Sequence, residues 1–300
     1  MDILKQKRKL GFSIGLYLLI VNSLAVFTKF IMTKTGAVAS FDEVILKYVL
    51  NIICGDVIGY IFLRAFLEKV DNVEKKEKQK LGISRVMLYI VIAIGLGLFV
   101  SFVTTTILMP IQLLTGVKIN NRVATLVTKS NPVMLIGYIG ILGPIVEELI
   151  FRRLLLNKLR VYGDLTAIVY TGVIFGLYHT NLVQIPFAIV IGLVLGLIVV
   201  KTNNVKYSMI VHIAINTMTA IINIFLQNGL YIYMAIFVLL ELLCALTAVI
   251  AVPIILSIDK YRPKVSNEGK YEKKKLYNNI GYIFTIIVVI VLTVLAIIIR

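Results

Sequence analysis

Long apolar runs recur along the whole chain, and they restrict the possible folds more than any other feature of the sequence. Hydrophobic residues occupy 59% of the 300 positions and charged residues only 15%, a balance that a soluble domain does not show. Each run is long enough to cross a bilayer core of about 30 Å as a helix of roughly 20 residues. The runs are continuous and lack the period-2 alternation of a membrane β-barrel. We therefore predict an all-α, polytopic transmembrane helical bundle.

Nine spans are expected, separated by short polar or basic segments. A re-entrant break hidden in the long span at 85–112 would change this count, so eight spans are an alternative. We expect the chain to divide into N-terminal helices and loops (1–130), a central core of helices (131–228) and C-terminal helices (229–300). The expected spans cover about residues 10–30, 43–66, 85–112, 133–156, 164–180, 182–200, 206–227, 230–257 and 278–299.

The net charge of +16 comes from basic residues that lie in short patches between the spans. This placement indicates membrane topology and attraction to anionic lipid, and it argues against a nucleic-acid partner. With the N-terminus in the cytoplasm, most Lys and Arg residues fall in or beside cytoplasmic segments, as the positive-inside rule requires. A chain rich in Ile, Lys and Asn is typical of bacteria, so we expect a multi-pass protein of a bacterial plasma membrane. The basic residues placed outside are Lys29, Lys34, Lys47, Lys118, Arg122, Lys129 and Arg300.

Two glycine pairs have the spacing that lets membrane helices approach closely. They are Gly172 with Gly176 in the fifth span, and Gly192 with Gly196 in the sixth. Small residues four apart remove side-chain bulk from one helix face. The pattern is frequent by chance in apolar sequence, but it is consistent with tight packing between these two spans.

Four residues inside the spans receive no catalytic role from the sequence. Cys54 and Cys244 lie far from polar loops, so we interpret them as packing residues and not as a disulfide or a metal pair. Asp56 and Glu241 are isolated acids in other spans, and the sequence assigns neither of them a function.

The span at 133–156 carries two adjacent carboxylates, Glu147 and Glu148. An ionised carboxylate in hydrocarbon costs roughly 3 kcal/mol or more, so two together need partners or water. Glu148 and Arg152 have the four-residue spacing of a helical ion pair, which taken alone could equally be structural. Pro144 cannot donate a backbone hydrogen bond, which leaves the carbonyl of Gly140 without its helical donor. Small residues and a free carbonyl beside Glu147 indicate a polar cavity.

Both histidines of the chain, His179 and His212, lie within apolar spans, and Asn216 shares a helix face with His212. Singly, each could be a packed residue or a helix–helix hydrogen bond. Together with the glutamates they suit hydrolysis: a carboxylate takes a proton from water, a histidine orients that water, and a His–Asn pair donates to a developing oxyanion. Upright ideal helices would place His212 roughly 9 Å and His179 roughly 24 Å from the cytoplasmic edge, so tilted or short helices are needed.

Three motifs, in order and spacing, resemble those of a known family. They are Glu147-Glu148-x-x-x-Arg152, Phe175-x-x-x-His179 and His212-x-x-x-Asn216. The pattern is similar to that of the CPBP family, the CAAX protease and bacteriocin-processing (Abi) intramembrane proteases, which include the type II CAAX prenyl endopeptidases. The resemblance covers about residues 130–220.

The resemblance implies a role for each site residue. Glu147 would be the general base that activates water, with help from His179. Glu148 and Arg152 would hold and tune it, and His212 and Asn216 would be the oxyanion donors. The favoured mechanism needs no cofactor, although such proteins are commonly classed as metalloproteases. A zinc ion, if used, would be held by Glu147, His179 and His212 together with water.

We therefore expect an intramembrane endopeptidase that cleaves a membrane-associated peptide or protein and has membrane lipid as its other partner. Peptide maturation and self-immunity to a bacteriocin are the roles that the resemblance suggests. A non-enzymatic scaffold that regulates a sensor kinase or cell-wall machinery is the main alternative. A proton-coupled transporter ranks third, because no internal repeat is visible. The sequence leaves the substrate, the metal and the oligomeric state open.

Overall fold

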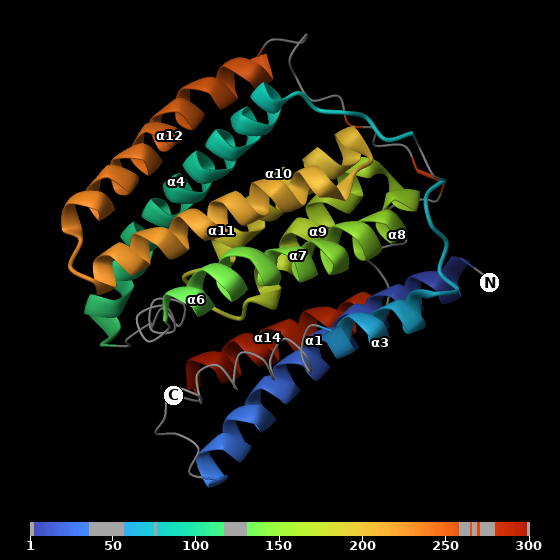
Figure 1. Cartoon of the computed structure of the whole chain (residues 1–300). Helices are drawn as coiled ribbons and strands as arrows, with labels where there is room; N and C mark the ends of the chain where they lie inside the picture. The colour runs from blue at the N-terminus through green and yellow to red at the C-terminus, as the bar shows by residue number, and fades with distance from the viewer. Residues whose placement is uncertain are drawn as a thin grey trace. The chain divides into compact units, whose positions relative to one another are not determined.

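The computed structural model describes residues 3–35, 57–74, 77–116, 131–257, 265, 269–270 and 280–298. Within these ranges the chain is all-α, with nine helices and no strands (Figure 1). The expected all-α class is confirmed. Most of the expected second span (43–66) lies outside the described residues, as do Cys54 and Asp56.

The helices begin and end within about three residues of the expected spans wherever the chain is described, with two exceptions. Helix α1 extends further at both ends, and the helix expected at 133–156 continues to Tyr162. One of them, Pro132–Tyr162, is a composite that joins several kinds of helical turn and is called the glutamate helix below. The helices are α1 (Ile3–Thr35), α3 (Ile58–Leu67), α4 (Ile83–Thr115), the glutamate helix, α9 (Asp164–Tyr178), α10 (Ile185–Thr202), α11 (Val205–Gln227), α12 (Tyr231–Ser257) and α14 (Ile280–Ile298).

Five helices of the described chain are long and apolar enough to cross a membrane. This supports a multi-pass membrane protein, while the count of nine spans and the inward N-terminus stay predictions. The span expected at 85–112 is one uninterrupted helix, α4, which continues through Pro110. The five helices are α4, the glutamate helix, α10, α11 and α12; α3, α9 and α14 contribute shorter apolar stretches.

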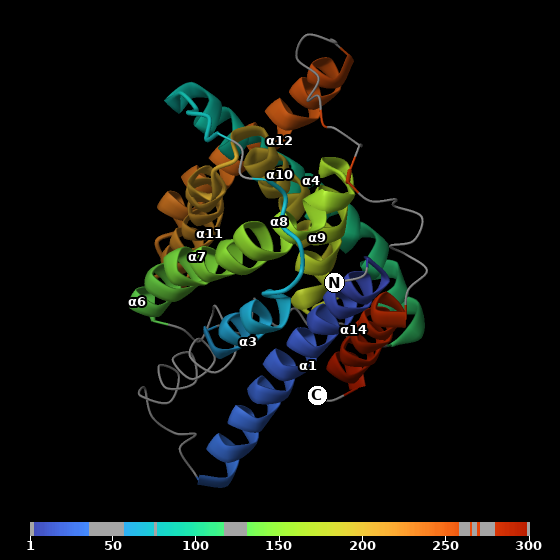
Figure 2. The same cartoon turned by 90° about the vertical axis from the view of Figure 1, so that its right-hand side faces the viewer.

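The described residues fall into two compact units. The first lies within Met1–Val73 and Gly269–Arg300 and contains α1, α3 and α14. In this unit the first and last helices, α1 and α14, lie side by side, as Figures 1 and 2 show. Gly11 and Gly281 meet at the crossing, where the Thr285 hydroxyl donates to the Gly11 carbonyl at 2.7 Å.

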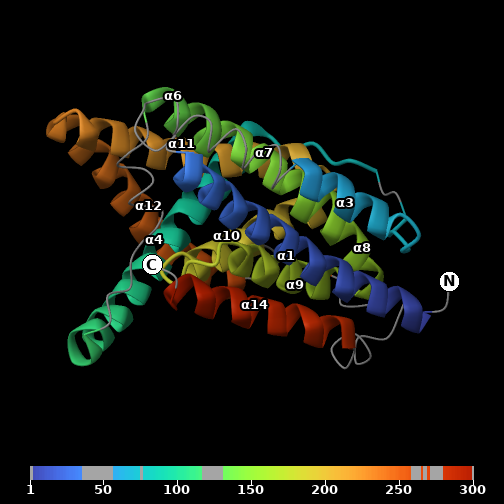
Figure 3. The same cartoon turned by 90° about the horizontal axis from the view of Figure 1, so that it is seen from below.

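The second unit, within Glu74–Glu268, contains α4, the glutamate helix and α9 to α12. Its apolar core forms where α4, α10 and α11 meet, around fully buried residues such as Ala93, Leu195, Ile198 and Val211. Figure 3 shows α11 alongside the glutamate helix, which carries the labels α6 and α7 there. All residues of the three sequence motifs lie in this unit.

The glycine pairs lie where α9 crosses α10, as their spacing indicated. A Cβ at Gly192 would lie 2.9 Å from the Cα of Gly172, and one at Gly176 would lie 2.8 Å from the Ile185 carbonyl oxygen. Both contacts are with backbone, so neither can be relieved by moving a side chain. The two helices therefore approach to a distance that only glycine permits at these positions.

An extended segment, residues 77–81, lies across the turn between α10 and α11 before it enters α4. The amide of Gln79 donates to the Thr202 carbonyl at 2.8 Å, and the amide of Leu81 donates to the Tyr207 hydroxyl at 2.9 Å. Tyr207 belongs to the first turn of α11, so this segment holds the end of the helix that carries His212.

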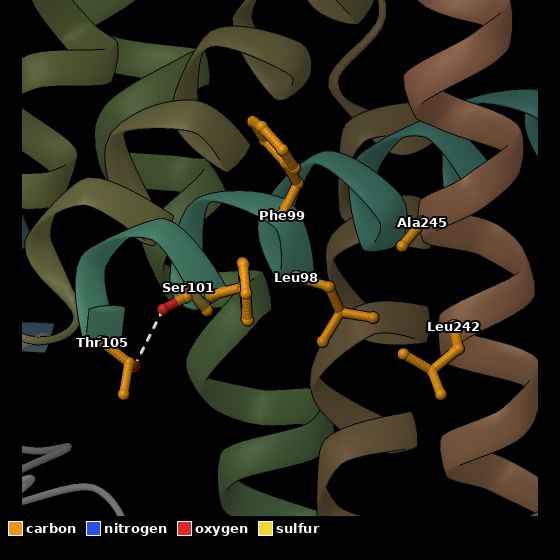
Figure 4. A pocket seen from close by; sticks show the side chains of 7 residues that line it. Leu98, Phe99, Ser101, Thr105, Leu242 and Ala245 are labelled. Carbon is orange, nitrogen blue, oxygen red and sulfur yellow. Dashed lines mark hydrogen bonds between the residues drawn. The ribbon is translucent and has the colours of Figure 1, made fainter. Parts of the chain in front are cut away.

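A groove of about 450 Å³ lies between α4 and α12 (Figure 4). Its walls are almost entirely apolar, and the hydroxyl of Thr105 is used within α4, where it donates to the Ser101 carbonyl at 2.9 Å. A side chain at Gly95 would collide with the Cys244 carbonyl, which explains how the two helices come close beside the groove. The lining residues are Leu98, Phe99, Ser101, Phe102, Thr105, Leu242 and Ala245.

We expect Gly192→Ala to lower the melting temperature and Gly196→Ala to be tolerated. At Gly192 the added methyl would lie 2.9 Å from the Cα of Gly172, so α9 and α10 would have to separate. At Gly196 the nearest atom, Ile168 Cγ2, is 3.5 Å away, an ordinary contact. Overpacking costs about 1–3 kcal/mol, whereas both variants gain the same helix propensity of about 1 kcal/mol.

Thermal unfolding of both purified variants in one detergent isolates the packing effect. A Gly192→Ala protein that melts no lower than Gly196→Ala would contradict this account of the crossing.

Candidate active site

The glutamate helix is irregular on both sides of the carboxylates. Glu147 and Glu148 end a short α-helical stretch, α7 (Gly143–Glu148), which lies between two π-helical stretches, Leu135–Leu142 and Leu149–Leu156. The first π stretch ends where the Gly143 amide donates to the Tyr138 carbonyl, five residues back. Wider turns of this kind occur often at functional sites, because they shift side chains out of α-helical register.

Glu148 and Arg152 form a fully buried ion pair, with Arg152 Nε 3.5 Å from Glu148 Oε1. Two neighbouring helices complete the surroundings of the guanidinium. Its carbon lies 4.4 Å from the ring centroid of Phe175 on α9, and its Nη2 donates to the Gly192 carbonyl on α10 at 3.3 Å. The predicted pair is therefore present, and it lies inside the bundle with no contact with solvent.

His212 on α11 lies between the two glutamates. Its Nδ1 is 3.2 Å from Glu148 Oε1, and its Nε2 is 3.6 Å from Glu147 Oε2. The side chain of Glu147 is 17% exposed and that of Glu148 is fully buried, so Glu147 is the member of the pair that water can reach. An imidazole with a carboxylate at each nitrogen can hold one carboxylate while it exchanges a proton with the other.

His179 lies at the C-terminal end of α9. Its Nδ1 is 2.8 Å from the Phe175 carbonyl oxygen one turn earlier, which directs Nε2 away from the helix backbone. The Phe175 ring packs edge-on against both histidines, with centroids 5.0 Å from His179 and 5.6 Å from His212. The separation that upright ideal helices would impose is therefore absent, because both histidines contact the same aromatic ring.

Asn216 lies one turn after His212 on α11 and faces the glutamate helix. Its Nδ2 donates to the Ile139 carbonyl at 3.1 Å. This bond orients the side-chain amide and uses one of its two N–H groups, so the second N–H remains for another acceptor.

The structure thus brings four of the six predicted residues into direct contact: Glu147, Glu148, Arg152 and His212. His179 joins them through Phe175, and Asn216 lies one turn along α11. Three polar atoms of the ion pair are buried and have no hydrogen-bond partner among the described residues: Glu148 Oε2, Arg152 Nε and Arg152 Nη1. Glu241 lies on α12, outside this cluster, and keeps no assigned role.

Sequence reasoning missed three contributors: Phe175, Gly192 and Thr217. The Phe175 side chain covers Arg152 and contacts both histidines, and the Gly192 carbonyl accepts from Arg152. The Thr217 hydroxyl donates to the Gly140 carbonyl at 3.3 Å. Phe175 and Gly192 belong to motifs in the sequence, but there they served only to define the spacing of those motifs. A hydroxyl next to Asn216 was the one signal for Thr217.

Glu147, His179 and His212 were the expected ligands if a metal is used. Within the part of the chain that the structure describes, no three His, Cys, Asp or Glu side chains form a group that could hold a metal ion. His212 directs both ring nitrogens at carboxylates, whereas the backbone bond at Nδ1 of His179 leaves its Nε2 available. In this arrangement the three residues do not form such a group.

The sequence of this region matches a protein-family model. The model describes type II CAAX prenyl endopeptidases, Rce1-like, and it matches residues 129–218, which include all six predicted site residues. Residues 129–218 are an Rce1-like type II CAAX prenyl endopeptidase family domain. The resemblance found in the three motifs is thereby confirmed, and it implies intramembrane protease activity. Comparisons with curated proteins and with solved structures gave no match.

We expect Arg152→Met to destabilise the protein strongly, because it leaves the carboxylate of Glu148 buried beside no guanidinium. Removing one partner of a buried ion pair costs about 3–5 kcal/mol. Thermal unfolding of the purified variant measures the loss. The matched control is Arg153→Met, which removes an exposed arginine next to it and should change stability little.

The double variant Glu148→Gln/Arg152→Met tests the pairing itself. We expect it to lose less stability than the two single variants together, because it leaves no unpaired charge. Additive losses would show that the two side chains act independently.

Proposed function

We propose that this chain is an endopeptidase that hydrolyses a peptide bond in a membrane-associated peptide or protein, using water activated by Glu147. The observation that carries the proposal is the position of His212 between the two glutamates, at 3.2 Å and 3.6 Å. A structural ion pair would need only Glu148 and Arg152. A second carboxylate that is partly exposed and faces a histidine is the arrangement of a general base.

In the proposed reaction, Glu147 takes a proton from a water molecule as the water oxygen attacks the substrate carbonyl. Glu147 then gives that proton to the leaving amine as the C–N bond breaks. Glu148 and Arg152 hold His212 and keep the surrounding charge balanced. The three orphaned polar atoms, Glu148 Oε2, Arg152 Nε and Arg152 Nη1, support the presence of water or a substrate group beside the pair.

The remaining residues take the roles implied by the family resemblance. Asn216 donates its second N–H to the oxyanion that develops on the substrate carbonyl. His212 donates through Nε2, which turns from Glu147, 3.6 Å away, to the oxyanion when substrate is bound. His179 orients the attacking water through Nε2, since its Nδ1 is bonded to backbone. This mechanism requires no cofactor; the zinc reading is kept as an outcome of the test below.

For the substrate, we propose a short membrane peptide in a bacterial plasma membrane. The apolar helices of the described chain, long enough to cross a membrane, support a site within the bilayer or at its surface. A pheromone or bacteriocin precursor fits such a site, and peptide maturation or self-immunity would be the corresponding role. A membrane scaffold that regulates a sensor kinase or cell-wall machinery remains the competing reading.

The test is peptide cleavage by the purified protein in liposomes, with a library of membrane-tethered peptides. We expect Glu147→Gln and His179→Ala to lower cleavage, with Glu147→Gln losing about 100- to 10,000-fold, the usual contribution of a general base. Glu241→Gln is the matched control, because it removes an intramembrane carboxylate of α12 outside the cluster and should leave cleavage unchanged.

The same assay separates the alternatives. Cleavage that survives both site substitutions would refute the proposed site. Cleavage abolished by a chelator and restored by zinc would replace the metal-free mechanism. A wild-type protein that cleaves no member of the library, with a cellular phenotype unchanged by Glu147→Ala, would favour the scaffold.

A further inference from the structure

The glutamate helix has a gap in its backbone hydrogen bonding just before the carboxylates. The amide of Gly143 donates to Tyr138 and so does not serve the Ile139 carbonyl four residues back. Pro144 follows and has no amide hydrogen, so the Gly140 carbonyl also loses its α-helical donor. Within a membrane-spanning helix such carbonyls need donors from elsewhere in the protein, because hydrocarbon offers none.

Helix α11 supplies both donors from two consecutive residues. Asn216 Nδ2 donates to the Ile139 carbonyl at 3.1 Å, and Thr217 Oγ1 donates to the Gly140 carbonyl at 3.3 Å. Gly140 permits this approach, because a Cβ there would lie 3.0 Å from Thr217 Oγ1. The two helices are therefore joined at one defined place, and not only along an apolar face that could slide.

The same two helices are joined a second time at the carboxylates. His212, one turn before the first link on α11, contacts Glu147 and Glu148 just beyond the proline. We propose that Thr217 is a positioning residue: through the Gly140 carbonyl it sets where the two carboxylates lie relative to His212. Sliding or rotating α11 along the glutamate helix would require both attachments to break.

A simpler role for Thr217 would be to satisfy a buried carbonyl without influencing the site. The chain offers variants that separate the two roles. Thr219 lies on the same helix, but its hydroxyl donates to Ile215 of its own helix at 3.2 Å, so Thr219→Val is a matched control. Pro144→Ala restores a backbone amide that can serve the Gly140 carbonyl from within the glutamate helix.

The measurement is nitrogen NMR of the full-length protein labelled with ¹⁵N in its histidine rings. The chain has two histidines, and His179→Gln assigns their signals. We expect Thr217→Val to shift the ring signals of His212, Thr217→Ser to restore them, and Thr219→Val to leave them unchanged. Unchanged His212 signals in folded Thr217→Val would overturn the proposal.

The Pro144→Ala background shows whether Thr217 positions the carboxylates or only satisfies the Gly140 carbonyl. Because the new amide of residue 144 can serve that carbonyl, this background also keeps the protein folded if Thr217→Val alone is unstable. We expect the His212 signals of Pro144→Ala/Thr217→Val to differ from those of Pro144→Ala, because the double variant lacks the hydrogen bond from Thr217 on α11. Identical signals in these two proteins would show that Thr217 only satisfies the carbonyl.

The consequence for catalysis rests on the proposed function, whereas the NMR result does not. In the cleavage assay, Thr217→Val should lower kcat, by up to about 100-fold if the carboxylates move by about 1 Å, with KM nearly unchanged. Thr217→Ser should recover most of the rate. If the wild-type protein cleaves nothing, the proposed function fails, and the His212 signals still decide the role of Thr217.

Discussion

The buried carboxylate of Glu148 is the group on which the architecture of the second unit depends. A charged side chain in a hydrocarbon environment needs partners close by, because the solvent provides none. Arg152 from the same helix and His212 on α11 contact the carboxylate directly. The guanidinium of Arg152 is in turn held by Phe175 on α9 and by the Gly192 carbonyl on α10. The contacts that stabilise the buried ion pair are therefore also contacts that hold these helices together.

The backbone of the glutamate helix also needs hydrogen-bond donors from elsewhere in the protein. Pro144 and the neighbouring π-helical turn leave two carbonyls without their usual donors, and α11 serves both. Helix α11 thus contacts the glutamate helix through polar groups before the proline and again at the carboxylates. Polar links between membrane helices specify a register that apolar faces alone leave free, since lipid chains are as apolar as the side chains that they would replace.

Close approach between helices makes these contacts possible. At the crossing of α9 and α10, Gly172 and Gly192 bring two backbones together, and Gly192 also presents its carbonyl to Arg152. The glycine spacing visible in the sequence therefore has a use beyond packing. It places a backbone acceptor inside the bundle, next to a guanidinium that is fully buried.

The sequence by itself determined the helices and the composition of the site. Apolar runs of about 20 residues predict helices long enough to cross a membrane, and the described chain contains five such helices. Glu148 with Arg152 is a pair within one helix, so the four-residue spacing sufficed. The tertiary structure alone decided that His212 lies between both glutamates, that Phe175 contacts both histidines, and that Asn216 holds the Ile139 carbonyl. Contacts between helices depend on tilt, register and local π-helical turns. Counting residues at about 1.5 Å per position assumes upright and regular helices. On that assumption the two histidines lie far apart, whereas in the fold both contact the Phe175 ring.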